Sequence, residues 1–201
     1  MVKRMLDLLL AGLGLVVVAP VGLIAAVVVF LSEGRPVFYL SRRVGQGGRE
    51  FTLHKLRTMV PRSDRGSLGS VTVADDARLS RTGRALRRWK LDELPQLVNV
   101  LKGEMSIVGP RPDAPEIVAL YTDEQREILR YRPGLTSPAS IRFVNEAELL
   151  ATSDDPRRLY IEEIMPEEIR LDLDYMKQAT VGSDLRVMLA TVVAVFRGSG
   201  R

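Results

Sequence analysis

The chain has 201 residues, of which 46% are apolar, enough for one ordinary core or for a membrane segment joined to one smaller domain. It contains no cysteine and one histidine, His54, so disulfide frameworks, thiolate zinc sites, cysteine nucleophiles and multi-histidine metal sites are excluded by count. The formal net charge of +4 is unevenly placed, since residues 42–111 hold 15 Lys and Arg against 7 Asp and Glu, whereas residues 112–201 hold 11 against 16. About a third of the chain is therefore suited to bind an anion.

The first predicted element is a membrane segment, because residues 8–31 are 24 consecutive positions without a charge. As a straight helix this run would be about 36 Å long, more than a bilayer core of roughly 30 Å requires. It exceeds the apolar region of a signal peptide and has no persuasive cleavage site. Two arrangements stay open: a plain spanning helix, or a re-entrant helix that bends at Pro20 and keeps its basic flanks on one side, Lys3 and Arg4 before the run and Arg35 after it.

A β-hairpin is predicted next. Residues 37–40 and 51–59 read as short strands around a glycine-rich turn at 44–48. Alternation in the second strand places Lys55 and Arg57 on one face among apolar neighbours, and leaves His54 on the other face as a packed or surface residue. Residues 60–78 are polar, contain proline and glycine, and are expected to form a surface loop.

Residues 82–89 are predicted to be helical, with Arg81, Arg84 and Arg88 as a basic stripe along the helix. Such a stripe is a solvated face, a contact with anionic lipid headgroups, or a phosphate-binding surface. The sequence alone leaves these alternatives open.

The acidic pair Asp92-Glu93 follows, with Asp92 at a position typical of a helix N-cap and Pro95 in the first turn. This helix is expected to end at Gly103 and to bury one apolar face, consisting of Leu94, Leu97, Val98 and Leu101. Acidic residues are common at the start of a helix, where the helix dipole favours them, yet this pair also follows the arginine stripe closely in the sequence. A structural cap and a functional carboxylate pair both remain possible at this point.

Residues 105–109 resemble a short buried strand that leads into Pro110-Arg111-Pro112, where two prolines stiffen the chain around one guanidinium. A stiffened arginine suits a phosphate group or a planar base.

The remaining elements are predicted mostly from caps and prolines. A capping box starts a helix over residues 122–130, and Pro156 and Pro166 each begin a helix. Residues 133–138 are expected to form an irregular loop. Residues 185–196 are mostly apolar and predict either a core helix or a helix lying in the membrane interface.

Taken in chain order, four blocks of residues resemble the bacterial sugar transferases known as monotopic phosphoglycosyl transferases, in their small form. The blocks are Phe51-Thr-Leu-His-Lys55-Leu-Arg57-Thr-Met59, Leu91-Asp92-Glu93-Leu-Pro95-Gln96-Leu-Val-Asn99-Val-Leu-Lys-Gly103-Glu104-Met-Ser106, Val-Gly109-Pro110-Arg111-Pro112 and Tyr131-Arg132-Pro133-Gly134-Leu-Thr136. The resemblance extends over residues 5–196, and its most specific parts are the D-E-L-P-Q-L and G-P-R-P blocks.

The resemblance implies an α+β, mostly helical protein. Residues 1–34 would form a re-entrant membrane helix bent at Pro20, and residues 35–201 one compact catalytic domain with a small β-hairpin and amphipathic interfacial helices. It implies transfer of a sugar-1-phosphate from a UDP-sugar to a polyprenyl phosphate, with undecaprenyl phosphate the expected acceptor, and release of UMP. This would be the first membrane step of a surface glycan pathway, at the cytoplasmic face of the bacterial inner membrane.

The same resemblance implies the roles of site residues. The family's nucleophilic aspartate corresponds to Asp92 and its neighbouring glutamate to Glu93, and family members use magnesium. Attack on a diphosphate needs charge neutralisation more than a strong base, because the attacking carboxylate and the later prenyl phosphate are already anions. We therefore expect Asp92 and Glu93 to hold Mg²⁺ together with substrate phosphates. The expected substrate-binding residues are Lys55, Arg57, Arg84, Arg88, Pro110, Arg111 and Pro112.

Two departures from the family pattern limit what carries over. Many members continue Gly-Trp-Ala-Gln-Val-Asn-Gly-Arg where this chain reads Ser137-Pro138-Ala139-Ser140-Ile141-Arg142-Phe143, so sugar specificity does not carry over. Ala19 stands where a serine often precedes the proline, so the angle of the bend does not carry over either.

Two rival hypotheses are a membrane-anchored basic module that binds anionic lipid without turnover, and a structural membrane protein whose site is inactive. Nucleic acid is not an expected partner, because only 5% of the residues are aromatic and stacking on single strands needs aromatic rings. The sequence does not define the donor sugar, the glycan pathway, the polyprenyl length or the oligomeric state.

Overall fold

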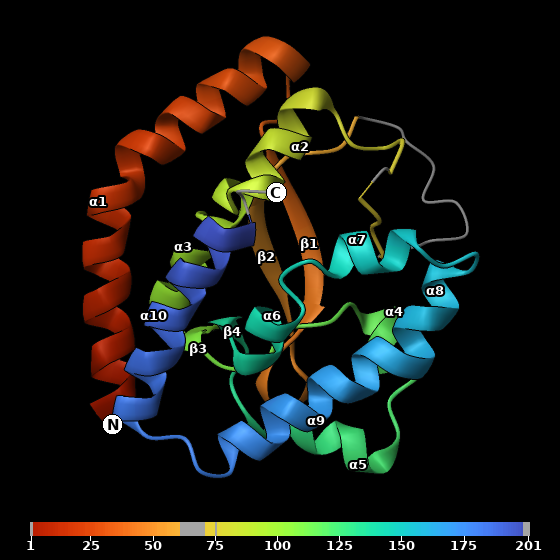
Figure 1. Ribbon diagram of the computed structural model, residues 1–201. Helices are drawn as coiled ribbons and strands as arrows, with labels where there is room; N and C mark the ends of the chain where they lie inside the picture. Colours follow the sequence, from red (N-terminus) through yellow and green to blue (C-terminus); the bar gives the residue numbers. More distant parts are fainter. Residues whose placement is uncertain (1, 61–70, 75, 199–201) are drawn as a thin grey trace.

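The computed structural model describes residues 2–60, 71–74 and 76–198. Within these ranges the chain is mostly helical, with two small two-stranded sheets and one long N-terminal helix along one side (Figure 1). The predicted α+β, mostly helical class is confirmed. Most of the predicted loop at 60–78 lies outside the described residues.

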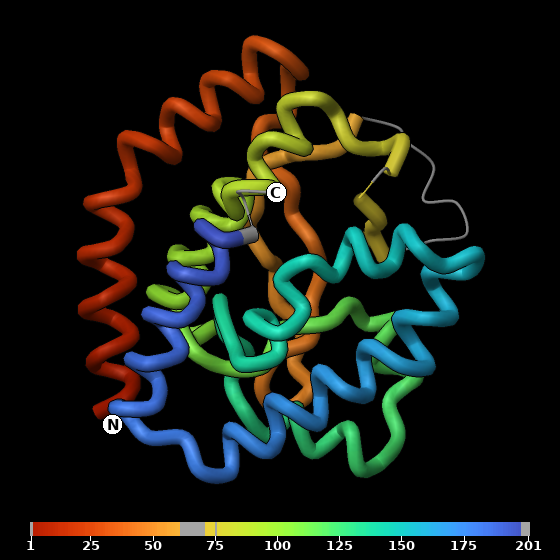
Figure 2. Tube along the Cα trace, viewed as in Figure 1, coloured from red at the N-terminus to blue at the C-terminus, as the bar shows by residue number. Residues whose placement is uncertain are grey.

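Helix α1 (Val2–Glu33) is a continuous 32-residue helix with Pro20 inside it. Among the described helices it is the one long and apolar enough to cross a membrane, by length and composition. Its axis changes direction near mid-length, as Figures 1 and 2 show. A proline in a helix removes one backbone hydrogen bond and favours such a bend.

Both ends of α1 are bonded to the globular part of the chain. In the first turns, Lys3 Nζ donates to Asp184 Oδ2 (2.5 Å), and Asp7 Oδ2 accepts from the Ser106 hydroxyl (2.8 Å). In the last turn, Arg57 Nη2 donates to the carbonyl of the final helical residue (2.6 Å). The helix therefore lies against the body at two places rather than projecting from it by one end.

The predicted β-hairpin is confirmed. Strands β1 (Phe38–Val44) and β2 (Glu50–Leu56) pair antiparallel and are joined by the short helix η1 (Gln46–Gly48). Gly47 and Gly48 have φ angles of 71° and 75°, which glycine adopts without a steric penalty. The ring Nδ1 of His54 lies 3.1 Å from Asn99 Oδ1, which agrees with the predicted packing role.

Helix α2 (Arg81–Arg88) is the first helix after the hairpin in the described part of the chain. Its N-cap Ser80 accepts a hydrogen bond from the Gly83 N–H (2.9 Å). A Cβ on Gly83 would lie 1.9 Å from the Thr58 carbonyl oxygen, so only glycine permits this approach. The contact fixes the rotation of α2 and turns Gly83 and Leu86 inward.

Helix α3 (Gln96–Lys102) ends at Gly103, as predicted, with a φ of 87°. Its predicted buried face is only partly right, because Leu97 is buried but Leu101 is exposed. The helix contacts both α1 and β2, and this two-sided cover requires a different set of buried residues: Gln96, Leu97, Asn99 and Val100.

Strand β3 (Ser106–Val108), predicted as a buried strand, pairs in parallel with β4 (Gly134–Thr136). The prediction of an irregular loop at 133–138 is wrong, since β4 is followed at once by helix α6 (Pro138–Arg142). The two strands meet through glycines: a Cβ on Gly134 would lie 2.1 Å from the Gly109 nitrogen. Pro133-Gly134 therefore marks a close backbone approach rather than a turn.

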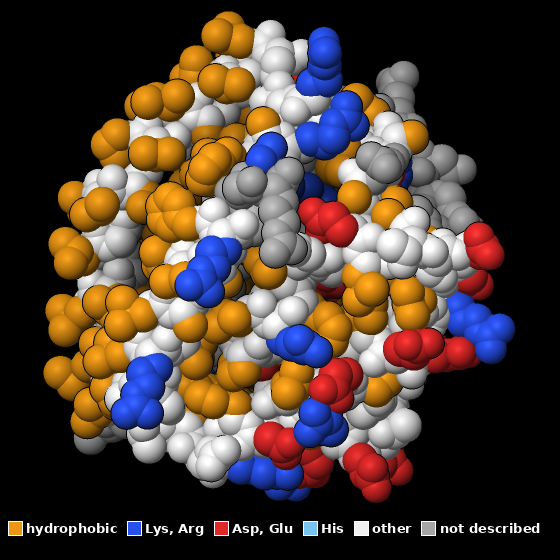
Figure 3. All heavy atoms as spheres, in the orientation of Figure 1, with side chains coloured by type: hydrophobic (Ala, Val, Ile, Leu, Met, Phe, Trp, Pro, Cys, Tyr) orange, Lys and Arg blue, Asp and Glu red, His pale blue; other side chains and the backbone are white. Residues whose placement is uncertain are grey.

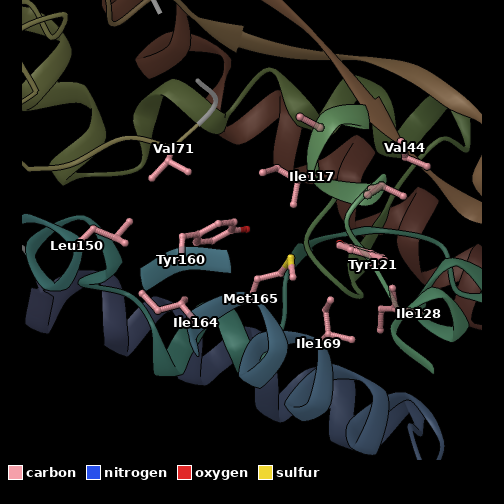
Figure 4. Packing of buried hydrophobic residues seen from close by; sticks show 12 residues of the cluster. Val44, Val71, Ile117, Tyr121, Ile128, Leu150, Tyr160, Ile164, Met165 and Ile169 are labelled. Atoms are coloured by element: carbon pink, nitrogen blue, oxygen red, sulfur yellow. The ribbon is translucent and has the colours of Figure 1, made fainter. Parts of the chain in front are cut away.

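The C-terminal half surrounds the largest hydrophobic core, shown in Figure 4, in which Tyr121, Tyr160 and Met165 are buried. The predicted capping box at Thr122 and the first-turn prolines of two helices are confirmed. The elements around this core are α4 (Pro115–Val118), α5 (Asp123–Arg126), η4 (Glu127–Arg130), α7 (Glu146–Ala151), α8 (Pro156–Leu159), the π-helical turn η5 (Tyr160–Ile164) and α9 (Met165–Met176).

Helix α10 (Val181–Gly198) leaves one apolar face exposed, made of Leu185, Leu189, Val192, Val193 and Phe196. The core-helix alternative for residues 185–196 is therefore wrong. Together with the exposed side chains of α1, this face forms the apolar left side of the molecule in Figure 3, whereas the acidic side chains visible there gather on the other side.

Candidate active site

Asp92 and Glu93 lie in a single 3-10 turn, η3 (Leu91–Glu93), between α2 and α3. Lys90 precedes it in the left-handed conformation with a φ of 54°, which turns the chain sharply. The predicted N-cap role of Asp92 is wrong, because α3 begins at Gln96 and is preceded by Pro95, which has no capping side chain. The carboxylate of Asp92 is thus not used to satisfy a helix end.

The Asp92 side chain is buried, with 3% of its surface exposed. Its Oδ1 has no hydrogen-bond partner among the described residues. Leaving a buried polar atom unpaired is unfavourable by about 1–3 kcal/mol, and more for a charged group. An orphaned carboxylate oxygen of this kind calls for a ligand or a chemical role.

Glu93 forms an ion pair with Lys55 from the hairpin, with 3.0 Å between Oε1 and Nζ and 16% of each side chain exposed. Burial raises the pKa of Glu93, but Lys55 and Arg111 outweigh burial and hold that pKa below its ordinary value. Burial lowers the pKa of Lys55, and Glu93 opposes this only in part. Glu93 is therefore held in its ionised form, beside a lysine whose charged form is disfavoured by burial.

Asp92 has the opposite tendency. Burial, followed by the charge of Glu93, raises the pKa of Asp92, while the cations Lys55, Arg87 and Lys90 oppose the rise. A carboxylate that is more basic than usual and short of hydrogen bonds is a better nucleophile than a solvated one. The two neighbouring carboxylates therefore differ in environment and can take different roles.

Arg111 follows β3 in the G-P-R-P loop and is exposed. Among the described residues no carboxylate oxygen lies within 4.0 Å of its guanidinium. Although the side chain reaches solvent, the protein around the guanidinium partly desolvates it and lowers the pKa of Arg111, whereas Glu93, Glu146 and Glu168 raise that pKa more. A guanidinium that carboxylates surround, but none pairs, is available to an anionic ligand.

The loop that carries Arg111 is held from several sides. The Gly134 N–H donates to the Pro110 carbonyl (2.8 Å). The Asp113 carboxylate accepts hydrogen bonds from the hydroxyls of Tyr121 (2.7 Å) and Tyr160 (3.1 Å). These contacts fix the backbone on both sides of the arginine and reduce the entropy that it loses on binding.

Asp172 of α9 lies next to the same loop. It is buried and accepts a hydrogen bond from the Ala139 N–H (3.0 Å), and the Ser137 side chain and the Arg111 backbone lie close enough to favour its charged form. Burial raises the pKa of Asp172 to about 6. The segments that follow β3 and β4 are therefore joined through one side chain.

Of the predicted site residues, the structure brings together Asp92, Glu93, Lys55 and Arg111, with Pro110 and Pro112 buried on either side of the arginine. Arg57 is elsewhere, since it donates to carbonyls at the end of α1. Arg84 and Arg88 lie on the exposed face of α2, and Arg84 donates to the Leu79 carbonyl (3.0 Å). The basic stripe does not face the carboxylate pair.

Three cations near the pair were missed by the sequence reasoning. Arg87 donates from Nε to the Thr58 hydroxyl (3.0 Å) and acts electrostatically on Asp92 and Glu93, as does Lys90. Arg43 of β1 lies within electrostatic range of Lys55, and its buried Nε has no partner among the described residues. Gly83 was the available signal, because its close contact turns Arg87, not Arg84, inward.

The profile of the family described as "Bacterial sugar transferase" matches residues 1–198. The chain belongs to this family. The UDP-glucose:undecaprenyl-phosphate glucose-1-phosphate transferase of Xanthomonas campestris is 37% identical over 197 residues, which cover 96% of this chain and 38% of that protein. A protein of the same name from Caulobacter vibrioides is 38% identical over 193 residues, 94% of this chain and 68% of that protein.

A third similar protein is the uncharacterized sugar transferase EpsL of Bacillus subtilis, 35% identical over 198 residues, which cover 98% of this chain and 89% of that protein. This sugar transferase chain thus spans from about two fifths to nearly nine tenths of the length of these relatives. The relatives therefore identify the family, while the reaction of this chain is argued from its own site.

The site of this sugar transferase can be tested for a metal. Within residues 2–60, 71–74 and 76–198, no group of three or more His, Asp or Glu side chains is arranged to hold an ion. Two adjacent carboxylates are present, and one of them has a buried oxygen without a partner. This donor set fits a hard divalent cation that takes its other ligands from substrate phosphates and water.

Proposed function

We propose that the chain transfers a sugar-1-phosphate from a UDP-sugar to a polyprenyl phosphate, expected to be undecaprenyl phosphate, through a covalent intermediate on Asp92. The observation that carries this proposal is the buried Asp92 carboxylate, which has an unpartnered Oδ1 and lies among Lys55, Arg87 and Lys90. Two relatives are named as transferases of this kind, with UDP-glucose and undecaprenyl phosphate as substrates.

In the first half-reaction, a carboxylate oxygen of Asp92 attacks the β-phosphorus of the UDP-sugar. The bond from that phosphorus to the oxygen bridging the two phosphates breaks, and UMP leaves with the electron pair. Lys55, Arg87 and Arg111 offset the negative charge that develops on the phosphoryl oxygens. The bond between the sugar and its phosphate is not broken.

In the second half-reaction, an oxygen of the polyprenyl phosphate attacks the same phosphorus. The acyl phosphate bond to Asp92 breaks, which restores the carboxylate and yields a polyprenyl diphosphate sugar. Neither step needs a general base, because both nucleophiles are anions. When bound, Mg²⁺ would be held by Asp92 and Glu93 and would neutralise charge on the phosphates.

We further propose that residues 1–34 form a re-entrant membrane helix and residues 35–201 a catalytic domain at the cytoplasmic face of the inner membrane. The contacts at both ends of α1 support this arrangement, since Lys3 and Arg57 bind opposite ends of the helix to one globular body. A straight spanning helix would separate those ends by the thickness of the bilayer.

The decisive experiment incubates the enzyme with Mg²⁺ and a UDP-sugar, without acceptor. About one UMP per active site should be released, and the peptide that carries Asp92 should gain the mass of one phospho-sugar, because a double displacement forms its intermediate before the acceptor binds. Asp92→Asn should abolish both signals, whereas Glu93→Gln should slow turnover.

The alternatives give different results. UMP release that requires both substrates, with intersecting rather than parallel initial-rate plots, would indicate direct transfer in a ternary complex and reduce Asp92 to a metal ligand. Binding of anionic lipid with no UMP release under any condition would support the non-catalytic basic module.

A further inference from the structure

Arg111 connects the proposed catalytic pair to a second group of carboxylates. On one side its electrostatic environment is set by Glu93, and on the other by Glu146 of α7 and Glu168 of α9. Neither Glu146 nor Glu168 comes within ion-pair distance of any cation among the residues described. No salt bridge therefore links the Arg111 guanidinium to either of these side chains.

Glu168 is the distinctive member of this group. It is 9% exposed, yet its carboxylate has no hydrogen bond within the described part of the chain, and its oxygens are not sealed from solvent. Buried carboxylates in native proteins are normally paired, because desolvating them otherwise costs stability. Its neighbour Glu167, by contrast, is half-buried and is paired with Arg170 (2.7 Å).

Glu146 adds a second open acceptor next to the segment in which this chain departs from its family. It is half-buried in the first turn of α7, and its backbone N–H bonds to the Phe143 carbonyl (2.9 Å) at the end of that segment. Helix α6, within the same segment, contacts α9. Glu146 therefore closely follows residues 137–143 in the chain, and Glu168 lies on the helix that contacts them.

We propose that Glu146 and Glu168 bind hydroxyl groups of the donor sugar beside the phosphate held by Arg111, and that they restrict the donor to neutral sugars. The inference rests on the proposed function. A carboxyl group accepts hydrogen bonds through its oxygens whether or not it is protonated, and the hydroxyls of a neutral sugar supply donors. A site built to bond a substrate hydroxyl discriminates strongly against a donor that cannot match it.

The charge balance of this region explains why an acidic sugar is excluded. Burial and the charge of Glu146 raise the pKa of Glu168, Arg111 opposes the rise, and Asp113 and Asp172 add to it. Arg111 therefore does not fully offset the acidic groups around it, so Glu168 tends to keep its proton. A uronic acid would bring one further carboxylate into this region.

The test measures kcat and KM for UDP-glucose, UDP-galactose, UDP-N-acetylglucosamine and UDP-glucuronate by UMP release with the full chain and a polyprenyl phosphate. The wild type should use a neutral donor with a kcat/KM at least ~100-fold above that of UDP-glucuronate. Glu146→Gln and Glu168→Gln should each raise KM for the neutral donor about tenfold and narrow this preference. The matched controls on the same helices, Glu148→Gln at an exposed position and Glu167→Gln at a half-buried one, should behave as wild type.

Binding of UMP, which lacks the sugar, separates recognition from folding. Its affinity should be unchanged in Glu146→Gln and Glu168→Gln, and an equal loss of UMP and UDP-sugar binding would overturn the inference in favour of a structural role. The inference would also be overturned if both variants turned over neutral donors as fast as the wild type does. Efficient use of UDP-glucuronate by the wild type would overturn it as well. Absence of UMP release from every donor would instead overturn the proposed function itself, and this inference with it.

Discussion

Arg87, rather than the arginines of the predicted stripe, brings the charge of α2 to the proposed nucleophile. We expect Arg87→Ala to lower kcat about 100-fold, because removing one preorganised donor from developing phosphoryl charge has an effect of this order. Arg84→Ala should change kcat less than about threefold, since Arg84 is exposed and makes a local hydrogen bond. Steady-state UMP release measures both values, with thermal unfolding as the check on folding.

If the basic stripe of Arg81, Arg84 and Arg88 bound the phosphate instead, the order of the two effects would be reversed. If Arg84→Ala proved more damaging than Arg87→Ala at equal stability, phosphate would bind on the exposed face of α2. That result would also contradict the electrostatic position of Arg87 beside Asp92 and Glu93.

The sequence indicated which side chains are chemically important, but not the direction in which each side chain points. Asp92, Glu93, Lys55 and Arg111 were identified from motifs, and the structure places them together. The inward turn of Arg87 depends on one close contact between Gly83 and the Thr58 carbonyl, which no periodicity reveals.

The parallel pair of β3 and β4 depends on two glycines facing each other. Gly134→Ala should lower the free energy of unfolding by about 3 kcal/mol, because its Cβ would lie 2.1 Å from the Gly109 nitrogen, and backbone has to move. Gly182→Ala in α10 is the control, where the nearest atom lies at 3.9 Å and alanine favours the helix by about 1 kcal/mol. Chemical unfolding in detergent micelles measures both variants.

Equal stability of the two alanine variants would show that the strands can separate without loss. The β3–β4 pair would then be too loose to hold Pro110 and Arg111 in place, contrary to the short hydrogen bond from Gly134 to Pro110.

Elements with local signals were predictable, and those made by distant contacts were not. The hairpin, the capping box at Thr122 and the helix stop at Gly103 each depend on residues within a few positions of one another. Strand β4 has three residues and exists only because β3, more than twenty positions earlier, lies beside it. The buried face of α3 was likewise set by cover from α1 and β2.

For the whole molecule, the proposed topology puts both ends of α1 on the cytoplasmic side. Because the chain has no cysteine, single substitutions Val2→Cys and Arg35→Cys give unambiguous labels. Both should react equally with an impermeant thiol reagent from the cytoplasmic side, as should a reporter at the exposed Asp174, whereas Val17→Cys should be shielded. Pro20→Leu should straighten α1 and make the label at position 2 less accessible.

Opposite accessibility of positions 2 and 35 in the otherwise unchanged chain would establish a spanning helix. It would also require that the bonds of Lys3 and Arg57 to the globular part are not both present in the membrane. The sequence alone did not distinguish a spanning from a re-entrant helix, and only the family resemblance favoured the re-entrant one. The partners of Lys3 and Arg57 lie far away along the chain, so these bonds could not be predicted from local patterns.

The bond between Lys3 and Asp184 also has a consequence for the order of events during synthesis. The two residues are 181 positions apart, so at usual elongation rates the partner of Lys3 is made roughly 10–40 s later. During that interval α1 is already apolar enough to enter the bilayer, while Lys3 has no counter-charge. Helix α1 is thus made well before the residue that bonds to its first turns, and this bond forms only once α10 has been made.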